Sequence, residues 1–294
     1  MLKLVERERP EPGMGQILVR VHAAGVNPVD ALNRQSGVFV GPPPFVLGWD
    51  VSGTVEVVGV GVTLYQPGDA VFALLPFPHG HGAYAQYVVA PTRVFVRKPA
   101  ALSHVQAAAL PLAGLTAWQA LVDTARIGAG SRVLITAPAG GVGHLAVQIA
   151  KAVGAHVIGL VNPTTAGYVT SLGADEVIDY TTTDFRESMS DADVVFDMIG
   201  HDYPEKALEV LKPGGTLVST LLQSLPAVAG VARDRGIQLA GLFVEADQLG
   251  LTALADLVTR GALSPTVAAV FPLEQAAQAQ SVRSGPGKTV LTVG

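Results

Sequence analysis

The apolar and polar positions of the chain follow two rhythms, and the first consists of short apolar runs. Residues 16–26, 51–62, 70–75 and 83–90 are rich in valine and other apolar side chains, with glycine and proline residues between them. Apolar runs of this length, bounded by turn-forming residues, are typical of strands. The pattern predicts a β-rich, barrel-like or sandwich region from about residue 16 to residue 96.

A second rhythm begins at Ser103, a candidate N-cap for a helical stretch that ends near Gly128. Strand-like and helix-like segments then alternate through residues 132–220, which predicts a parallel sheet covered by helices on both faces. Residues 265–293 predict one helix and one strand that return to the first region. The expected fold class is therefore α/β, with a doubly wound parallel-sheet domain over residues 107–261 and a β-rich domain over residues 1–106 and 262–294.

The composition of the chain speaks against several classes of partner and site. The 294 residues are 49% hydrophobic and 15% charged, and a net charge of −5 without a basic stripe speaks against nucleic acid as a partner. The chain has no cysteine, which excludes disulfides and thiolate metal sites. Its first residues are too polar for a signal peptide, and its two long uncharged stretches contain proline and glycine. We therefore expect a cytoplasmic protein without a membrane partner.

A glycine cluster at residues 140–143 carries the first chemical signal. Gly140, Gly141 and Gly143 directly follow a predicted strand and open an amphipathic helix. Glycines in this context form the dinucleotide fingerprint, because backbone N–H groups at a helix start bind pyrophosphate. A tight turn without a ligand is the alternative. His144, just inside the helix, is either near a phosphate or a solvated helix residue.

The following strand bears on the choice of cofactor. It ends at Asn162, where a site for NAD usually has an acidic residue that holds the ribose hydroxyls. Without a carboxylate, the 2′-phosphate of NADP is not repelled. NADP(H) is therefore the expected cofactor, although no arginine or lysine lies between Asn162 and Ser171 to select it strongly.

Motifs along almost the whole chain resemble the medium-chain dehydrogenase/reductase superfamily, in its zinc-independent quinone oxidoreductase-like branch. They include AAGVNPVDALNRQSG, VLGWDVSGTVEVVGVGV, AAALPLAGLTAWQAL, APAGGVGHLAVQIAKAVGAHVIG, LGADEVIDY and GKTVLTV. The resemblance implies that the β-rich domain is GroES-like and catalytic. Zinc-dependent relatives have a cysteine near Asn27 and a His–Glu pair after Gly48; here Trp49 and Asp50 follow that glycine, so no zinc site is expected.

The resemblance also implies the site residues. It places Asn27 and Asp30 beside the nicotinamide or the substrate carbonyl, where Asn27 would donate to a developing oxyanion. Its cofactor residues are Asn27, Thr116, Ala139, Gly140, Gly141, Val142, Tyr180, Ser219 and Phe243. The family's basic residue near 164–167 is missing here, which leaves Asn162, Thr164, Thr165 and Tyr180 to hold the 2′-phosphate.

Trp49 and Tyr84 are candidates for an apolar substrate pocket, with core packing as the alternative for each. Tyr84 is also a candidate proton donor, although water is an equal possibility. Asp30 alternatively caps the helix that follows it, Thr116 is alternatively an ordinary buried hydroxyl, and Tyr180 is alternatively a core residue.

The expected function is NADPH-dependent hydride transfer to a quinone or an α,β-unsaturated carbonyl compound. An NADPH-binding regulatory or structural protein with little turnover, and an enoyl-thioester reductase, remain alternatives. The resemblance further implies a homodimer joined through the edge of the Rossmann sheet, with residues 236–244 as the candidate edge.

Overall fold

Two compact units share the chain in the computed structural model, which describes residues 2–282 and 285–294. The first unit comprises Met1–Leu115, Val244–Gly261 and Pro265–Gly294, and the second comprises Thr116–Phe243 and Ala262–Ser264. The predicted second domain, residues 107–261, therefore differs from the observed unit at both ends.

The first unit is built on one seven-stranded sheet. Its strands are β1 (Gln16–Gly25), β2 (Asp50–Val58), β3 (Ala70–Leu74), β4 (Tyr87–Pro91), β5 (Phe95–Arg97), β12 (Val267–Pro272) and β13 (Lys288–Thr292). The order is β12-β13-β1-β2-β3-β5, and β4 pairs separately with β1. The apolar runs of the sequence thus form strands, as predicted.

Strand β1 organises this sheet because it has three partners. Its first half, from Gln16 to Arg20, pairs with β4, while Ala23–Gly25 pair with β13, and β2 runs along the whole other side. All three pairings are antiparallel, so the end of β1 lies beside the beginnings of β2 and β13. The returning tail contributes two strands rather than one, with the short helix α10 (Ala276–Ala279) between them.

Short helices complete the first unit: α1 (Pro28–Ser36), α2 (His104–Ala108), the start of α3 (Pro111–Trp118) and α9 (Gln248–Thr259). Ser103 caps α2, as predicted, because its hydroxyl accepts the backbone N–H of Gln106. The single predicted helix is split before Pro111, since proline cannot donate the helical hydrogen bond. Helix α9 belongs here because Gln248 donates to the backbone oxygen of Phe95 at 2.8 Å.

The second unit is a six-stranded parallel sheet with the order β11-β10-β9-β6-β7-β8. Its strands are β6 (Arg132–Ile135), β7 (His156–Val161), β8 (Glu176–Asp179), β9 (Ala192–Asp197), β10 (Leu211–Ser219) and β11 (Gln238–Gly241). The order reverses at β6, as in a doubly wound sheet. The fold class predicted from the sequence is confirmed.

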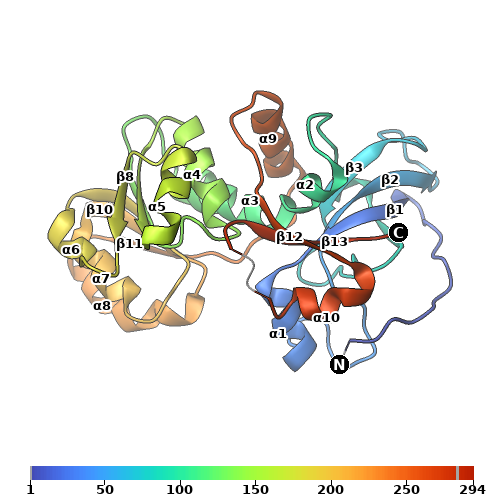
Figure 1. Cartoon of the computed structure of the whole chain (residues 1–294), viewed down its shortest axis with the longest axis horizontal. Coiled ribbons are helices and arrows are strands. Elements are labelled where there is room, and N and C mark those ends of the chain that lie inside the picture. Colours follow the sequence, from blue (N-terminus) through green and yellow to red (C-terminus); the bar gives the residue numbers. More distant parts are fainter. Residues whose placement is uncertain (1, 283–284) are drawn as a thin grey trace. The chain divides into compact units, whose positions relative to one another are not determined.

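Helices cover both faces of this sheet. They are α4 (Gly143–Ala152), α5 (Pro163–Ser171), α6 (Phe185–Ser188), α7 (Tyr203–Val210) and α8 (Ala229–Asp234). In Figure 1, α4 and α5 lie on one side of the sheet, and α7 and α8 lie on the other. Strand β11 is an edge strand, and the dimer contact expected there stays a prediction.

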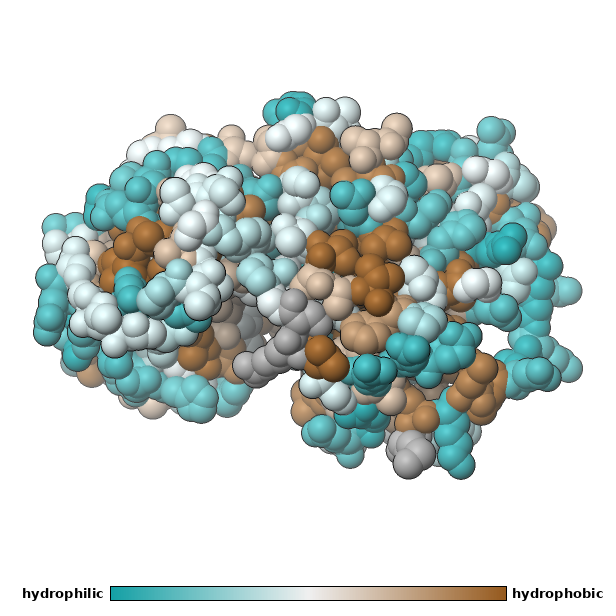
Figure 2. Space-filling model, viewed as in Figure 1, coloured by the Kyte–Doolittle hydropathy of each residue, from teal (hydrophilic) through white to brown (hydrophobic). Residues whose placement is uncertain are grey.

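On the face shown in Figure 2, hydrophobic residues form separate patches among hydrophilic ones. Within residues 2–282 and 285–294, no helix has the length and apolar character needed to cross a bilayer.

Candidate functional site

The glycine loop joins β6 to α4 in the second unit. Its Gly140 N–H donates to the oxygen of Ala137 at 3.1 Å, and Gly143 is the first residue of α4. A Cβ atom at Gly143 would lie 1.9 Å from that same oxygen, so only glycine permits this approach of helix and loop. Ala139, Gly140, Gly141 and Val142 remain partly exposed, which leaves the loop accessible to a ligand.

His144 is not a solvated helix residue, and its closeness to a phosphate stays a prediction. The sequence suggested a residue near a phosphate or in solvent, but the side chain is completely buried. Its Nδ1 atom lies 2.9 Å from the oxygen of Gly140, which fastens the glycine loop to the first turn of α4. The correction has a physical cause: the tight contact at Gly143 brings this turn under the loop, away from water.

The four residues expected to hold a 2′-phosphate gather at the ends of β7 and β8. Asn162 caps α5, where its Oδ1 atom accepts from the Thr165 N–H and from the hydroxyls of Thr164 and Thr165 at 2.7–3.1 Å. Its Nδ2 atom lies 3.5 Å from the hydroxyl of Tyr180. Because β7 and β8 are adjacent and parallel, the sheet itself brings Asn162 and Tyr180 together. Tyr180 is half exposed, at 48%, which speaks against the core alternative.

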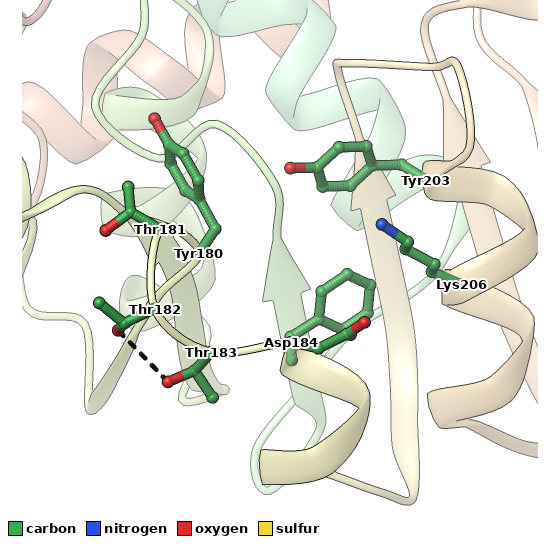
Figure 3. Close-up of a pocket in the computed structure, with 8 residues that line it drawn as sticks. Tyr180, Thr181, Thr182, Thr183, Asp184, Tyr203 and Lys206 are labelled. Atoms are coloured by element: carbon green, nitrogen blue, oxygen red, sulfur yellow. Dashed lines mark hydrogen bonds between the residues drawn. The ribbon is translucent and has the colours of Figure 1, made fainter.

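Tyr180 also lines a pocket of about 240 Å³. Figure 3 shows Tyr180 and Thr181 on one side and Tyr203 and Lys206, from α7, on the other, with Thr183 and Asp184 lower down between them. The Lys206 ammonium group forms an ion pair with Asp202 at 2.7 Å. Sequence reasoning missed Tyr203 and Lys206, because α7 joins this pocket only through the fold.

The remaining predicted cofactor residues belong to other elements of the structure. Thr116 is buried in α3, and Phe243 follows β11 and is 42% exposed. Ser219 ends β10 at the same edge of the sheet, but its hydroxyl donates to Asp197 at 2.8 Å and accepts from the Leu221 N–H. That hydroxyl is therefore engaged in holding the turn after β10.

The first unit contains a buried polar cluster where three strand ends meet. Asn27 follows β1, Asp50 opens β2 and Lys288 opens β13, and the antiparallel pairing places all three together. The Asn27 Nδ2 atom donates to Asp50 at 2.8 Å, while Lys288 Nζ donates to Asn27 Oδ1 and, at 2.9 Å, to the oxygen of Val26. Both oxygen and nitrogen of the Asn27 amide are thus fixed in orientation, with one Nδ2–H left over.

The charges of this cluster compensate one another. Lys288 Nζ lies 3.7 Å from Asp50 Oδ2, and the Leu112 N–H donates to Asp50 Oδ1 at 2.7 Å. Burial raises the pKa of Asp50 and lowers the pKa of Lys288, and the opposite charge of the partner counters each shift. The residues therefore form an ion pair whose members depend on each other. Sequence reasoning assigned neither to the site, although a lysine and an aspartate opening apolar strands are a usable signal.

Asp30 and Tyr84 extend the cluster. Asp30 Oδ2 accepts the Asn27 N–H at 2.7 Å and the Tyr84 hydroxyl at 2.9 Å. Asp30 thus takes part in the capping box of α1, the structural alternative for this residue. Gly48 has a φ of +94°, and a Cβ there would lie 2.4 Å from the Tyr84 ring, so this glycine makes room for the tyrosine.

Trp49 lies in the core rather than in a pocket. Its side chain is fully buried, its Nε1 atom donates to the oxygen of Pro78 at 3.2 Å, and its ring makes an edge contact with Phe77. These contacts leave no free face for a substrate. The geometry therefore favours the core-packing alternative for Trp49.

Comparison with known proteins agrees with this architecture. The family models described as "Alcohol dehydrogenase GroES-like domain" and "Zinc-binding dehydrogenase" match residues 13–100 and 172–291. The mitochondrial NAD(P)H oxidoreductase RTN4IP1 of Danio rerio is 33% identical, over 95% of this chain and 84% of its own length. The 2-haloacrylate reductase of a Burkholderia species is 35% identical, over 93% and 89%.

The quinone oxidoreductase structure from Coxiella burnetii superposes with a TM-score of 0.90 at 34% identity, over 99% of this chain and 95% of that one. The chain belongs to the medium-chain dehydrogenase/reductase superfamily. Within this superfamily it belongs to the zinc-independent quinone oxidoreductase-like branch. It is thus an oxidoreductase with a nicotinamide cofactor.

The name of the matched zinc-binding family raises the question of a metal, and the residues present do not fit one. Where zinc-dependent members of the superfamily have cysteine, histidine and glutamate, this chain has Asn27, Trp49 and Asp50. Trp49 has no ligand atom, and Asp50 is already paired with Lys288 and Asn27. Within the described residues, no group of three or more histidine, aspartate or glutamate side chains is arranged to hold a metal.

Replacement of Gly143 by alanine tests the glycine loop. The new Cβ would overlap the oxygen of Ala137, so we expect the free energy of unfolding to fall by about 1–3 kcal/mol. Urea denaturation measures the change. Gly230→Ala, on α8 with open space around it, is the matched control, which we expect to be neutral or up to about 1 kcal/mol more stable. Equal effects of the two changes would contradict the close contact.

Replacement of Lys288 by methionine tests the buried ion pair. It leaves Asp50 charged and uncompensated, and we expect a loss of about 3–5 kcal/mol in the free energy of unfolding. Adding Asp50→Asn to that variant should restore part of the loss. Lys206→Met, which breaks a surface pair with Asp202, should cost about 1 kcal/mol or less. A similar loss for both lysine variants would show that the Lys288 pair is not effectively buried.

Proposed function

We propose that this protein is an NADPH-dependent reductase that transfers hydride to a quinone or to an α,β-unsaturated carbonyl compound. One observation carries the choice of NADPH. Asn162 and the hydroxyls of Thr164, Thr165 and Tyr180 meet at the ends of β7 and β8, where a site for NAD has a carboxylate. These groups are neutral, so they tolerate a 2′-phosphate.

The residues of the second unit suit the dinucleotide. The cradle at Gly143 and the partly exposed loop of residues 139–142 would hold its pyrophosphate, since the N–H groups at the start of a helix favour anions. The end of β7 would hold the adenosine ribose. When bound, NADPH supplies the hydride.

The first unit supplies groups that would stabilise or neutralise the negative charge formed on the reduced substrate. Lys288 and Asp50 fix the Asn27 amide, whose remaining Nδ2–H would donate to a developing oxyanion. Tyr84 would deliver the proton. Burial and the neighbouring Asp30 hold the pKa of Tyr84 well above its usual value, so the phenol keeps its proton at neutral pH.

The names of the relatives support the substrate class, because a quinone and a 2-haloacrylate are both electron-poor conjugated systems. Carbonyl reduction helped by zinc does not suit this chain, since its residues do not fit the metal. Hydride addition to a conjugated acceptor requires only positioned donors and a proton.

Fluorescence titration with NADPH and with NADH tests cofactor binding. Turnover is then measured as the loss of absorbance of the reduced cofactor when 1,4-benzoquinone or pent-1-en-3-one is added. We expect preferential binding of NADPH and its oxidation by at least one acceptor. Tight binding without turnover would support a regulatory or structural role instead. Failure to bind either cofactor would overturn the proposal.

An Asn162→Asp variant tests the cofactor preference. Aspartate also caps helices, so α5 is retained, but its charge would repel the 2′-phosphate. We expect the affinity for NADPH relative to NADH to fall about tenfold, which corresponds to roughly 1.4 kcal/mol. Thr170→Asp, exposed on the same helix, is the control for added charge and should leave the ratio unchanged. An equal loss of both cofactors would place the 2′-phosphate elsewhere.

A further inference from the structure

Asp30 has an oxygen atom that its structural role does not explain. Its Oδ2 atom accepts the Asn27 N–H and the Tyr84 hydroxyl, which satisfies the helix cap. Its Oδ1 atom is completely buried without a hydrogen-bond partner. Leaving a polar atom unpaired in the interior is costly, and native proteins usually do so only for a reason.

A second side chain with unpaired groups adjoins the same hydroxyl. Gln280, just after α10, has both amide atoms buried, and neither forms a hydrogen bond of regular geometry. The amide nevertheless lies close enough to the Tyr84 hydroxyl to lower the pKa of Tyr84, as a hydrogen bond to its phenolate would. In the described part of the chain, these two side chains account for every buried side-chain polar atom that lacks a partner. Unused hydrogen-bonding capacity is thus concentrated around Asp30 and Tyr84.

The groups that face Asp30 come from three different elements. Tyr84 precedes β4, Asp50 opens β2 and Lys288 opens β13. Burial raises the pKa of Asp30 to about 7; the Asn27 N–H, the Tyr84 hydroxyl and the charge of Lys288 oppose the rise, and Asp50 adds to it. The carboxyl group therefore gains and loses a proton near neutral pH, while Tyr84 does not.

We propose that Asp30 is the proton reserve for Tyr84, a positioning residue that acts through the tyrosine hydroxyl in the reductase reaction proposed above. When Asp30 is ionised, the Tyr84 hydroxyl donates to Oδ2 and is turned toward it. When Asp30 is protonated, the hydrogen bond reverses, and the tyrosine proton is free for the substrate. The 2.9 Å distance between the two oxygens permits direct transfer.

Every proton in this transfer from Asp30 through Tyr84 to the substrate is accounted for. As hydride adds to the substrate, the Tyr84 O–H bond breaks and its proton forms the new bond to the resulting enolate or quinolate. The O–H bond of Asp30 breaks at the same time, and its proton restores the phenol. Asp30 is left as a carboxylate and takes a proton from water before the next cycle. No further oxidant or reductant is needed.

The test is an Asp30→Asn variant of the full-length protein, assayed with NADPH and pent-1-en-3-one. Asparagine keeps a hydrogen bond to Tyr84 but cannot give up a proton. We expect kcat to fall at least about tenfold, with KM for the enone changed less than about twofold. The kcat of the wild-type protein should decline as the pH rises through about 7, and the variant should lack this decline.

Asp247→Asn is the matched control, because Asp247 caps α9 through two backbone N–H groups in the same unit. We expect it to retain kcat and the wild-type pH profile. In contrast, Tyr84→Phe and the double variant Asp30→Asn/Tyr84→Phe should be equally slow, since Asp30 acts only through the tyrosine. An active wild-type protein whose Asp30→Asn variant retains both kcat and the decline near pH 7 would overturn the proposal.

Infrared spectroscopy tests Asp30 without any turnover. The difference between the wild-type and Asp30→Asn spectra should contain the band of a protonated carboxyl that disappears as the pH rises through about 7. In Tyr84→Phe the band should persist to higher pH, because the phenol lowers the pKa of Asp30. If neither acceptor is reduced but the band titrates as expected, the proposed function fails while Asp30 still carries an exchangeable proton. Absence of the band overturns the role of Asp30.

Discussion

The buried contact of Lys288 with Asp50 and Asn27 is the interaction on which the first unit depends. It joins residues that are far apart in the sequence, at the point where β1 ends and β2 and β13 begin. The strand pairing brings these residues together, and their charges then make the pairing specific. A shift of β13 along β1 would leave an ammonium group and a carboxylate without partners in an apolar interior.

The second unit depends on a constraint of space rather than charge. Gly143 approaches Ala137 more closely than any side chain would allow, and His144 secures the resulting loop from below. The parallel pairing of β7 and β8 positions the other half of the candidate site, because it places the ends of both strands at one edge of the sheet, with Asn162 and Tyr180 side by side. The candidate nucleotide site thus follows from the sheet topology and one glycine.

These two origins explain what the sequence could reveal. The strand, the glycines and the position of Asn162 at the end of the next strand are local features, so they could be predicted from spacing and residue type. The Lys288–Asp50 pair could not, since it joins two ends of the chain whose pairing is not encoded locally. The burial of Trp49 and His144 depends in the same way on what folds over them, and α9 joins the first unit through Gln248, a contact that no local pattern indicates.

The same cluster limits how the protein can stabilise negative charge. The Lys288 ammonium group is the buried cation of the cluster, and it is already committed to Val26, Asn27 and Asp50. Moving it toward a substrate oxygen would leave the buried Asp50 carboxylate without its counter-charge, at a cost that the interaction with a neutral carbonyl would not offset. Asn27, Trp49 and Asp50 also stand where zinc-dependent relatives have their metal ligands. In the proposed reaction, charge on the substrate must therefore be removed by a proton rather than held by a cation. The hydrogen bond between Asp30 and Tyr84 meets this requirement. It joins a phenol that keeps its proton to a carboxyl group that exchanges a proton near neutral pH.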